Sequence, residues 1–396
     1  MSKVFFAWSF LHSFKYFNYI YYDPTFGGQI TQIIDFIILI SFLLNNKINR
    51  NWYTGDFILL FLSVPILSIL PAYLNKGQPV LSSVQGVLDL TKILIYFYLY
   101  KFEIKERLVL NLLIAFVVIR FSITVLQQWY NSDFLFVGPG RARGEFGDEI
   151  ELRGGVYRFL LDGEFISPLV FFYAIQKLLE KFRWKLFVIL LISLGGIFLD
   201  QTRQTWSAII VIFLFFVFPK LNFWSRVVLI SLIFFSLAYD YGNLIFGDMS
   251  TNTVDEFNSD NVRWLAAYFF LFNYWNGNLT LILGNGLAHK SSYFREIVSL
   301  QEQDGLYRVD IGIIGYFNQY GIYGLIVLLT FFIYIYRKYW KLLDLYIKLY
   351  ALYCVVILPT FVGLTGSGQY WLFMGVLFFL IDSSLNRNAS AFELRK

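Results

Sequence analysis

The chain has 396 residues, of which 58% are hydrophobic and only 15% charged, and its formal net charge is +5. Soluble domains carry about 25% charged residues, so the composition excludes an ordinary soluble protein and indicates an integral membrane protein. One cysteine, Cys354, and two histidines exclude a disulfide framework and are too few for a Cys- or His-based metal site. We expect no metal, no cofactor and no nucleic-acid partner.

The apolar segments predict an all-α polytopic protein that forms a single transmembrane domain over residues 1–396. They are long enough to cross about 30 Å of hydrocarbon as helices, which excludes a transmembrane β-barrel. The twelve predicted spans are residues 4–22, 28–45, 55–73, 83–100, 107–127, 158–177, 184–200, 203–219, 225–240, 309–336, 342–364 and 368–385.

The first segment, residues 4–22, is followed by no small-residue cleavage site, so we expect it to be retained. Lys15 and His12 interrupt this segment, and if it only lies on the membrane surface the number of spans falls to eleven; Lys3 favours twelve. The short links on one side of the spans are rich in Lys and Arg, which makes that side cytoplasmic by the positive-inside rule. These links are residues 46–54, 101–106, 178–183, 220–224 and 337–341.

Two connections on the opposite, outer side are not simple links. Residues 128–157 contain GPGRARGEFGDEIELRGG, whose glycines suit turns or the close approach of a ligand. Residues 241–308, between the ninth and tenth spans, are far longer than a connection needs to be, which is typical of functional loops. The apolar runs at residues 265–274 and 279–283 predict short helices that lie at the membrane interface.

A group of arginines falls on this outer side. Basic residues are disfavoured in short outer loops, so their presence indicates a function. A guanidinium binds phosphate with two parallel hydrogen bonds, and we therefore expect a phosphate-containing ligand. The outer arginines are Arg141, Arg143, Arg153, Arg158, Arg203, Arg263 and Arg308.

Arg203 and Arg120 have unusual positions within the predicted helices. Arg203 opens a helix after the polar turn at residues 200–205, where the helix dipole disfavours a cation unless an anion joins it. The alternative is that Asp200 pairs with Arg203 and caps the helix. Arg120 lies about two turns inside its span with no acidic residue three or four positions away, so it needs a partner from another helix or from a ligand.

Arg158 begins the span that follows the glycine-rich loop, with Asp162 one helical turn further on. A local Arg158–Asp162 pair is one interpretation, and it would contribute only a few tenths of a kcal/mol if exposed. The other interpretation is that Asp162 and Glu164, which lie deeper, orient an arginine from below.

Other charges and glycines within the spans have structural explanations. Asp89 and Lys92, and likewise Asp344 and Lys348, are spaced so that each pair neutralises itself on one helix face. Glycines on the tenth span predict close helix packing; these are Gly312, Gly315, Gly321 and Gly324.

Asp310 and Asp304 are the candidate general bases. Asp310 lies at the start of a predicted helix, where a carboxylate commonly caps free amides, but Arg308 is two residues away. A carboxylate beside cationic phosphate ligands could accept a proton from a sugar hydroxyl. Capping would lower the pKa of Asp310 and weaken it as a base, so Asp304 is the second candidate.

Nucleotide-binding patterns are missing from the sequence. There is no Walker-type phosphate loop and no dinucleotide glycine pattern followed by a strand and a helix. A cytoplasmic nucleotide donor is therefore not expected, and a donor would carry its phosphate within the membrane as a lipid diphosphate.

Four segments, in this order, resemble the bacterial O-antigen and exopolysaccharide repeat-unit polymerases (Wzy-type), of the superfamily shared with O-antigen ligases. The segments lie between residues 154 and 329, a stretch of somewhat under half the chain, and are GGVYRFLLDGEF, LDQTRQTWSAIIVIFLF, NVRWLAAYFFLFNYWNGNLTLILGNGL and RVDIGIIGYFNQYGIYGLIVLL. In them, Arg203 is similar to the family's arginine at a helix start, and Arg263 to the arginine of a helix that leads to a Gly-x-Gly turn.

The resemblance implies a GT-C-like membrane glycosyltransferase that polymerises undecaprenyl-diphosphate-linked oligosaccharides by inversion and without metal. The enzyme would lie in the bacterial inner membrane, face the periplasm and work with a chain-length regulator protein. Arg203 and Arg263 match the diphosphate-binding positions. We expect Arg158, Arg120 and Arg308 to join them, and a loop bearing Arg141, Arg143 and Arg153 to bind glycan.

Two other functions remain open at this stage. Ligases of the superfamily have a histidine near the segment that closes the large loop, whereas this chain has Asp310 there, which favours a polymerase. A flippase for the same lipid-linked sugar would also bind diphosphate through arginines. However, a flippase has little use for a long outer loop, and the unpaired basic residues concentrate at the outer ends of the spans.

Overall fold

The computed structural model describes residues 2–14, 24–44, 53–129, 152–153, 156–157, 162–200, 202–220, 262–365 and 368–393. These residues are all-α apart from one antiparallel pair of two-residue strands, β1 (Leu152–Arg153) and β2 (Val156–Tyr157). The predicted ninth span, 225–240, most of the predicted loop 128–157 and the first part of the loop 241–308 lie outside the described residues.

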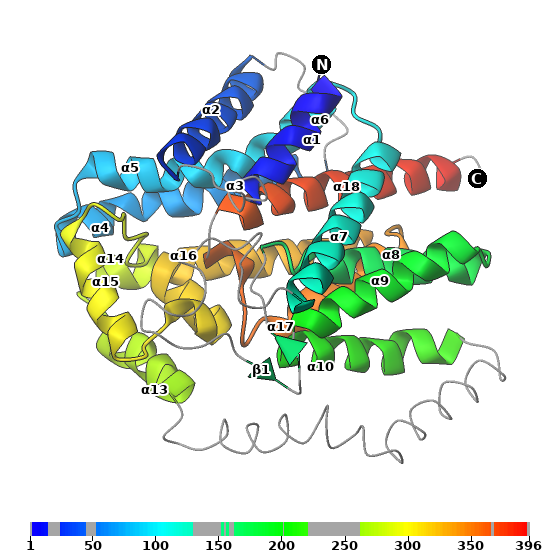
Figure 1. Ribbon diagram of the computed structural model, residues 1–396. Helices are drawn as coiled ribbons and strands as arrows, with labels where there is room; N and C mark the ends of the chain where they lie inside the picture. Colours follow the sequence, from blue (N-terminus) through cyan, green and yellow to red (C-terminus); the bar gives the residue numbers. More distant parts are fainter. Residues whose placement is uncertain are drawn as a thin grey trace.

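The described helices of the first half lie in the blue to green part of Figure 1. They are α1 (Ser2–Ser13), α2 (Pro24–Leu43), α3 (Gly55–Leu67), α4 (Ile69–Lys76), α5 (Val80–Leu88), η2 (Asp89–Leu94), α6 (Ile95–Lys101), α7 (Glu106–Trp129), α8 (Ile166–Glu180), α9 (Trp184–Asp200), α10 (Arg203–Ile212), η3 (Phe213–Val217) and η4 (Phe218–Lys220).

The second half, yellow to red in Figure 1, begins with short helices and ends with long ones. They are α13 (Val262–Tyr268), η6 (Phe269–Asn273), α14 (Asn278–Leu283), α15 (Tyr293–Gln303), η7 (Arg308–Ile311), α16 (Gly312–Tyr334), η8 (Ile335–Tyr339), α17 (Leu345–Ile357), η9 (Gly363–Thr365) and α18 (Gly368–Glu393).

Five helical segments within the described ranges are long and apolar enough to cross a membrane, as expected for a membrane protein. They are Gly55–Lys76, Val80–Lys101, Glu106–Gln128, Arg308–Tyr339 and Gly368–Ala389, and each coincides with a predicted span. Shorter apolar helices occupy Ile30–Leu43, Gln204–Phe216 and Leu345–Ile357, inside three further predicted spans. Large apolar side chains point outward from such helices, for example Leu81 (71% exposed) and Phe215 (71% exposed), as a lipid-facing surface requires.

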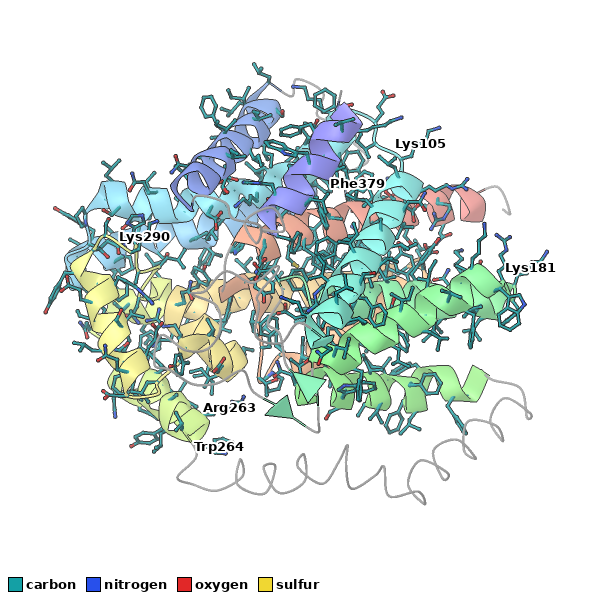
Figure 2. All side chains as sticks on the ribbon, viewed as in Figure 1. Lys105, Lys181, Arg263, Trp264, Lys290 and Phe379 are labelled. Carbon is teal, nitrogen blue, oxygen red and sulfur yellow. The ribbon has the colours of Figure 1, made fainter. Side chains whose placement is uncertain are left out.

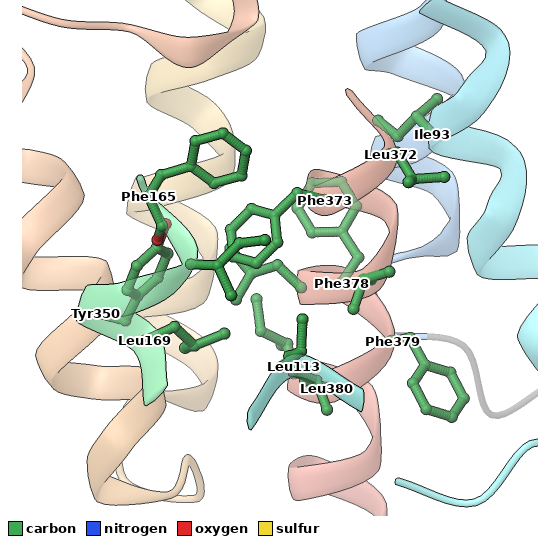
Figure 3. Packing of buried hydrophobic residues seen from close by; sticks show 14 of the residues in the cluster. Ile93, Leu113, Phe165, Leu169, Tyr350, Leu372, Phe373, Phe378, Phe379 and Leu380 are labelled. Atoms are coloured by element: carbon green, nitrogen blue, oxygen red, sulfur yellow. The ribbon is translucent and has the colours of Figure 1, made fainter. Parts of the chain in front are cut away.

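Helix α18 lies at the centre of the bundle. In its apolar 18-residue window 83% of the residues are buried, against 44–56% in the other four long segments. Phe165 and Tyr350 approach α18 from one side (Figure 3), with ring centroids 4.8 and 5.9 Å from that of Phe373. The hydroxyl of Tyr350 donates to the carbonyl oxygen of Phe165 at 3.1 Å. Aromatic side chains thus fill the space between α8, α17 and α18.

Residues 262–308, the described part of the large predicted loop, form short helices, and their position at the membrane interface stays a prediction. Helices α14 and α15 lie near α4 at the left of Figure 1, with α13 below them, and α14 packs against both α4 and α16. In Figure 2, Lys290 of this region and Lys181 lie at opposite ends of the molecule. Lys181 belongs to a link that is predicted to be cytoplasmic.

A break in α16 receives the Gly284–Asn285–Gly286 turn. Gly321 has a left-handed conformation (φ +68°) inside α16, which interrupts the helical hydrogen bonds. The carbonyl oxygens of Asn318 and Gln319 instead accept from the backbone N–H groups of Asn285 (3.0 Å) and Gly286 (2.9 Å). This contact fixes the turn against the middle of a membrane-spanning helix.

Candidate functional site

Arg308 opens the turn η7 at the end of the predicted outer loop. Its Nη1 donates a long hydrogen bond to the carbonyl oxygen of Gly286 (3.4 Å). Its Nε and Nη2 atoms are buried and have no hydrogen-bond partner in the described part of the chain. A buried cation whose donors are unsatisfied is strongly unfavourable, so this guanidinium is suited to an anionic ligand.

Lys76, the last residue of α4, lies beside Arg308 and was missed by the sequence analysis. Its side chain is buried, and its Nζ lies 4.0 Å from the centroid of the Tyr274 ring. Arg308 lies at the same ring, since its guanidinium carbon is 5.7 Å from the Tyr274 centroid. Lys76 follows the span 55–73 on the predicted outer side, so the positive-inside rule that selected the arginines could have found it.

No carboxylate within the described ranges forms an ion pair with Lys76 or Arg308. Glu302 attracts Arg308 electrostatically. Its carboxylate oxygens, however, accept from Nη1 and Nη2 of Arg295 at 3.0 and 2.8 Å. Glu302 is therefore already paired with a third cation, Arg295, and forms no ion pair with Arg308.

Two aromatic rings lie against the cations. The guanidinium carbon of Arg308 is 5.4 Å from the ring centroid of Phe270 and 5.7 Å from that of Tyr274. Both rings belong to a small apolar core that joins η6 to Ile311 and the first turn of α16. An aromatic face attracts a cation, so the rings hold the two charges in place without neutralising them.

Gln78 fixes this region to the membrane-spanning helices. Its buried amide nitrogen donates to Ser83 Oγ and to the carbonyl oxygen of Leu287, both at 2.8 Å. Its amide oxygen accepts from the backbone N–H of His289 (2.8 Å) and from Ser292 Oγ (2.7 Å). Three of these bonds join Gln78, which precedes α5, to the segment before α15, so Gln78 sets where Lys76 meets the loop.

Asp310 lies in the same turn as Arg308, whereas Asp304 ends α15 and is exposed. The N-cap positions of η7 and α16 are occupied by Tyr307 and Ile311, so Asp310 lies inside η7 and not at an N-cap. Asp310 and Asp304 both remain candidate bases.

The other predicted phosphate ligands are only partly described. Arg263 is exposed on α13, which packs against η7, so its helix lies next to the Arg308 turn. Arg203 begins α10, as predicted, but its side chain lies outside the described residues, as does the side chain of Arg153 in β1. Three further predicted residues fall wholly outside them: Arg141, Arg143 and Arg158.

Arg120 finds its partner on another helix. Its Nη1 and Nη2 donate to the two carboxylate oxygens of Asp200 at 2.9 and 2.5 Å, and both side chains are buried. This ion pair joins α7 to α9. The alternative pairing of Asp200 with Arg203 involves a side chain that lies outside the described residues. We interpret Arg120 as a residue that links two helices, and its part in diphosphate binding stays a prediction.

The carboxylates beside Arg158 in the sequence contact α18 instead. Asp162 accepts from Gln369 Nε2 (3.1 Å), and Glu164 accepts from the hydroxyl of Tyr370 (2.8 Å). Glu164 also lies within electrostatic range of the Arg120–Asp200 pair. These bonds join the turn before α8 to the start of α18.

The two predicted intrahelical charge pairs differ in outcome. Lys92 pairs with Asp89, as expected, and also lies 3.6 Å from Asp35 on α2. Asp344, in contrast, forms an ion pair with Arg387 of α18, which also binds Glu106 at 2.5 Å. Arg387 of α18 therefore connects Asp344, which precedes α17, with Glu106 of α7, a contact that the spacing of Asp344 to Lys348 did not predict.

A separate apolar cavity of about 80 Å³ lies between α16, α17 and α18, and Phe165, Tyr353 and Cys354 line it. It contains none of the predicted site residues. In the described ranges, no three His, Cys, Asp or Glu side chains come together as a metal site requires.

Comparison with known proteins adds no family to this description. The chain matches no protein-family model and no curated protein. The likeness of its motifs to the Wzy-type polymerases therefore stays a prediction. The geometry itself shows a buried lysine and an arginine whose Nε and Nη2 are buried, both at aromatic rings, with Asp310 in the same turn as the arginine. Two such cations can bind an anion.

Proposed function

We propose that this protein is a glycosyltransferase that polymerises undecaprenyl-diphosphate-linked oligosaccharide repeat units at the periplasmic face of a bacterial inner membrane. The observation that carries the proposal is the guanidinium of Arg308, whose Nε and Nη2 have no hydrogen-bond partner among the described residues. It ends the predicted outer loop, where a lipid-linked diphosphate would meet the chain. Arg203, Arg263 and Arg158 complete the proposed diphosphate site.

The proposed reaction follows from where charge develops. The hydroxyl of an acceptor sugar attacks the anomeric carbon of the donor, and the bond from that carbon to the diphosphate oxygen breaks. Asp310 accepts the hydroxyl proton, and the lipid diphosphate leaves with one more negative charge than the donor carried. Fixed cations that hold this group more tightly as its charge grows lower the barrier.

The long outer loop has a role in this scheme. Its described helices surround Arg308 with the rings of Phe270 and Tyr274. Such a cover keeps out water that would otherwise hydrolyse the donor and strengthens the electrostatic interactions inside. No step of the proposed reaction uses a nucleotide or a metal.

The test uses purified protein in liposomes with undecaprenyl-diphosphate-linked repeat units, and the products are separated by gel electrophoresis. We expect a ladder of lengthening glycans without added nucleotide or metal. Arg308→Met should slow its formation by about 10²–10³-fold, the usual loss when a preorganised charge-stabilising group is removed. Arg183→Met, which removes an exposed arginine from the link before α9, is the matched control and should behave as wild type.

The two alternative functions give different products. Transfer of a finished glycan to a lipid A acceptor, without lengthening, would mean a ligase. Passage of the lipid-linked sugar across the bilayer, without any ladder, would mean a flippase and would remove the catalytic role of Asp310.

A further inference from the structure

Lys76 has no assigned role in the reaction just proposed, yet its position is unusual for a lysine. It lies at the end of a membrane-spanning segment and is only 8% exposed. Lysine side chains near helix ends normally extend toward water. Here the Nζ instead lies over the Tyr274 ring at 4.0 Å, with the Phe294 ring at 5.9 Å.

Tyr274 connects Lys76 with Arg308. The same ring contacts the ammonium group of Lys76 and the guanidinium group of Arg308. Two like charges at a shared aromatic ring repel each other, and no described carboxylate pairs with either of them. Such a pair of cations is favourable only when a ligand supplies the missing negative charge.

We propose that Lys76 and Arg308 together form one binding site for a diphosphate group, in which Lys76 is a second phosphate-binding residue. A diphosphate that links a lipid to a sugar carries one negative charge on each phosphorus, which matches two cations. The identity of the lipid rests on the proposed function; the presence of a two-cation anion site does not.

The surroundings favour an anion with several oxygen atoms. The Nε and Nη2 of Arg308 provide two buried donors without acceptors, and the ammonium group of Lys76 provides up to three more. The hydroxyl of Tyr274 is also buried, interacts with Arg308 and can donate to phosphate oxygen. All of these groups come from separate segments that Gln78 and the Gly284–Gly286 turn hold together.

The experiment measures binding to the purified full-length protein in neutral detergent. The probes are undecaprenyl diphosphate, inorganic pyrophosphate and phosphatidylglycerol, and the readouts are Kd and the thermal unfolding midpoint. We expect undecaprenyl diphosphate and pyrophosphate to bind, and phosphatidylglycerol to bind at least tenfold more weakly. Lys76→Met should raise the Kd for both diphosphates at least tenfold, a loss of about 1.4 kcal/mol of binding free energy or more. Lys76→Arg keeps the positive charge and should keep the Kd within about threefold of wild type.

Lys290→Met is the matched control, since Lys290 is an exposed lysine of the same loop, and it should bind as wild type. Without ligand, Lys76→Met should unfold at the same temperature as wild type or higher, because it removes a buried charge that has no partner. A residue that only supported the structure would lower the midpoint instead. Should Lys76→Met not fold, Lys76→Gln replaces it.

Several results would overturn the inference. They are wild-type affinity in Lys76→Met or Lys76→Gln, an equal loss in Lys290→Met, and binding of phosphatidylglycerol alone. Failure of the polymerase proposal looks different. If diphosphate binding depends on Lys76 but no glycan ladder forms, the two-cation site stands and the polymerase proposal fails. If a ladder forms equally well in wild type and in Lys76→Met, the polymerase proposal stands and the role of Lys76 fails.

Discussion

Gly321 of α16 and Gly284 of the loop turn touch backbone to backbone. A Cβ atom on Gly321 would lie 2.5 Å from the nitrogen of Gly284, and one on Gly284 would lie 2.1 Å from the carbonyl oxygen of Gln319. Both residues also have positive φ angles, +68° and +82°. The contact leaves no room for a side chain on either residue, and it brings the loop that carries Arg308 against a membrane-spanning helix.

Replacing Gly321 with alanine should therefore separate the turn from α16. The new methyl group meets backbone atoms that cannot move aside, and the φ angle adds strain of about 1–2 kcal/mol. We expect a lower thermal unfolding midpoint and loss of diphosphate binding in Gly321→Ala. Gly86→Ala in α5 is the control, because nothing lies within 4 Å of its added Cβ and alanine favours the helix. Unchanged binding in Gly321→Ala would show that the turn does not position the site.

The Arg120–Asp200 pair gives a second prediction. Removing one member of a buried ion pair leaves an uncompensated charge and costs about 3–5 kcal/mol. Arg120→Met and Asp200→Leu should each reduce the amount of folded protein sharply, as measured by size-exclusion chromatography and thermal unfolding. The double variant should recover most of the stability, since an apolar pair of similar volume often replaces a buried ion pair without loss.

Activity separates this structural role from ligand binding. If the double variant folds and still makes polymer, Arg120 is not a diphosphate ligand. A folded double variant without activity would restore Arg120 to the binding site and contradict our interpretation.

Asp310 and Asp304 can be distinguished by amide substitutions. Asp310 shares the η7 turn with Arg308, whereas Asp304 is exposed at the end of α15. We expect Asp310→Asn to lose at least 10²-fold in the rate of glycan transfer, as general bases contribute about 10²–10⁴-fold, with diphosphate binding retained. Asp304→Asn should keep the wild-type rate. The opposite order of the two rates would move the base to Asp304.

Gln78 gives a prediction about stability within one region. Gln78→Ala removes four hydrogen bonds, among them those to the partly buried backbone groups of Leu287 and His289, and each lost bond costs about 1 kcal/mol. Hydrogen–deuterium exchange should rise in residues 286–303 but not in α18. Ser63→Ala, which removes a hydroxyl bonded to Leu60 and Tyr323 on the lipid-facing side, should leave exchange in residues 286–303 unchanged. Equal exchange in Gln78→Ala and wild type would mean that other contacts hold the loop.

Features encoded by local periodicity could be predicted from the sequence. Long apolar runs specify the five long segments, since a helix needs only length and hydropathy to cross a membrane. The short helices of the outer loop and the close packing at Gly315 and Gly324 also follow from local composition. The Lys92–Asp89 pair was predictable because residues three apart face each other on a helix.

Partners that meet only through helix packing could not be predicted in this way. Arg120 visibly needed a partner, but Asp200 is 80 residues away, and no helical spacing connects them. The same holds for Asp344, whose partner Arg387 lies 43 residues further on. Lys76 and Arg308 meet through Tyr274 for the same reason, so the sequence indicated phosphate-binding arginines without the lysine that joins one of them.

The distance along the chain between Arg120 and Asp200 has a consequence for biogenesis. At a synthesis rate of about 5–20 residues per second, α7 leaves the ribosome roughly 4–16 s before Asp200 does. During that interval the guanidinium of Arg120 has no carboxylate from α9 to neutralise it, and a bare charge in hydrocarbon is costly. Helix α7 must then stay beside the insertion machinery, or near the lipid headgroups, until α9 emerges. The pair of helices, rather than each helix alone, becomes the unit that enters the bilayer.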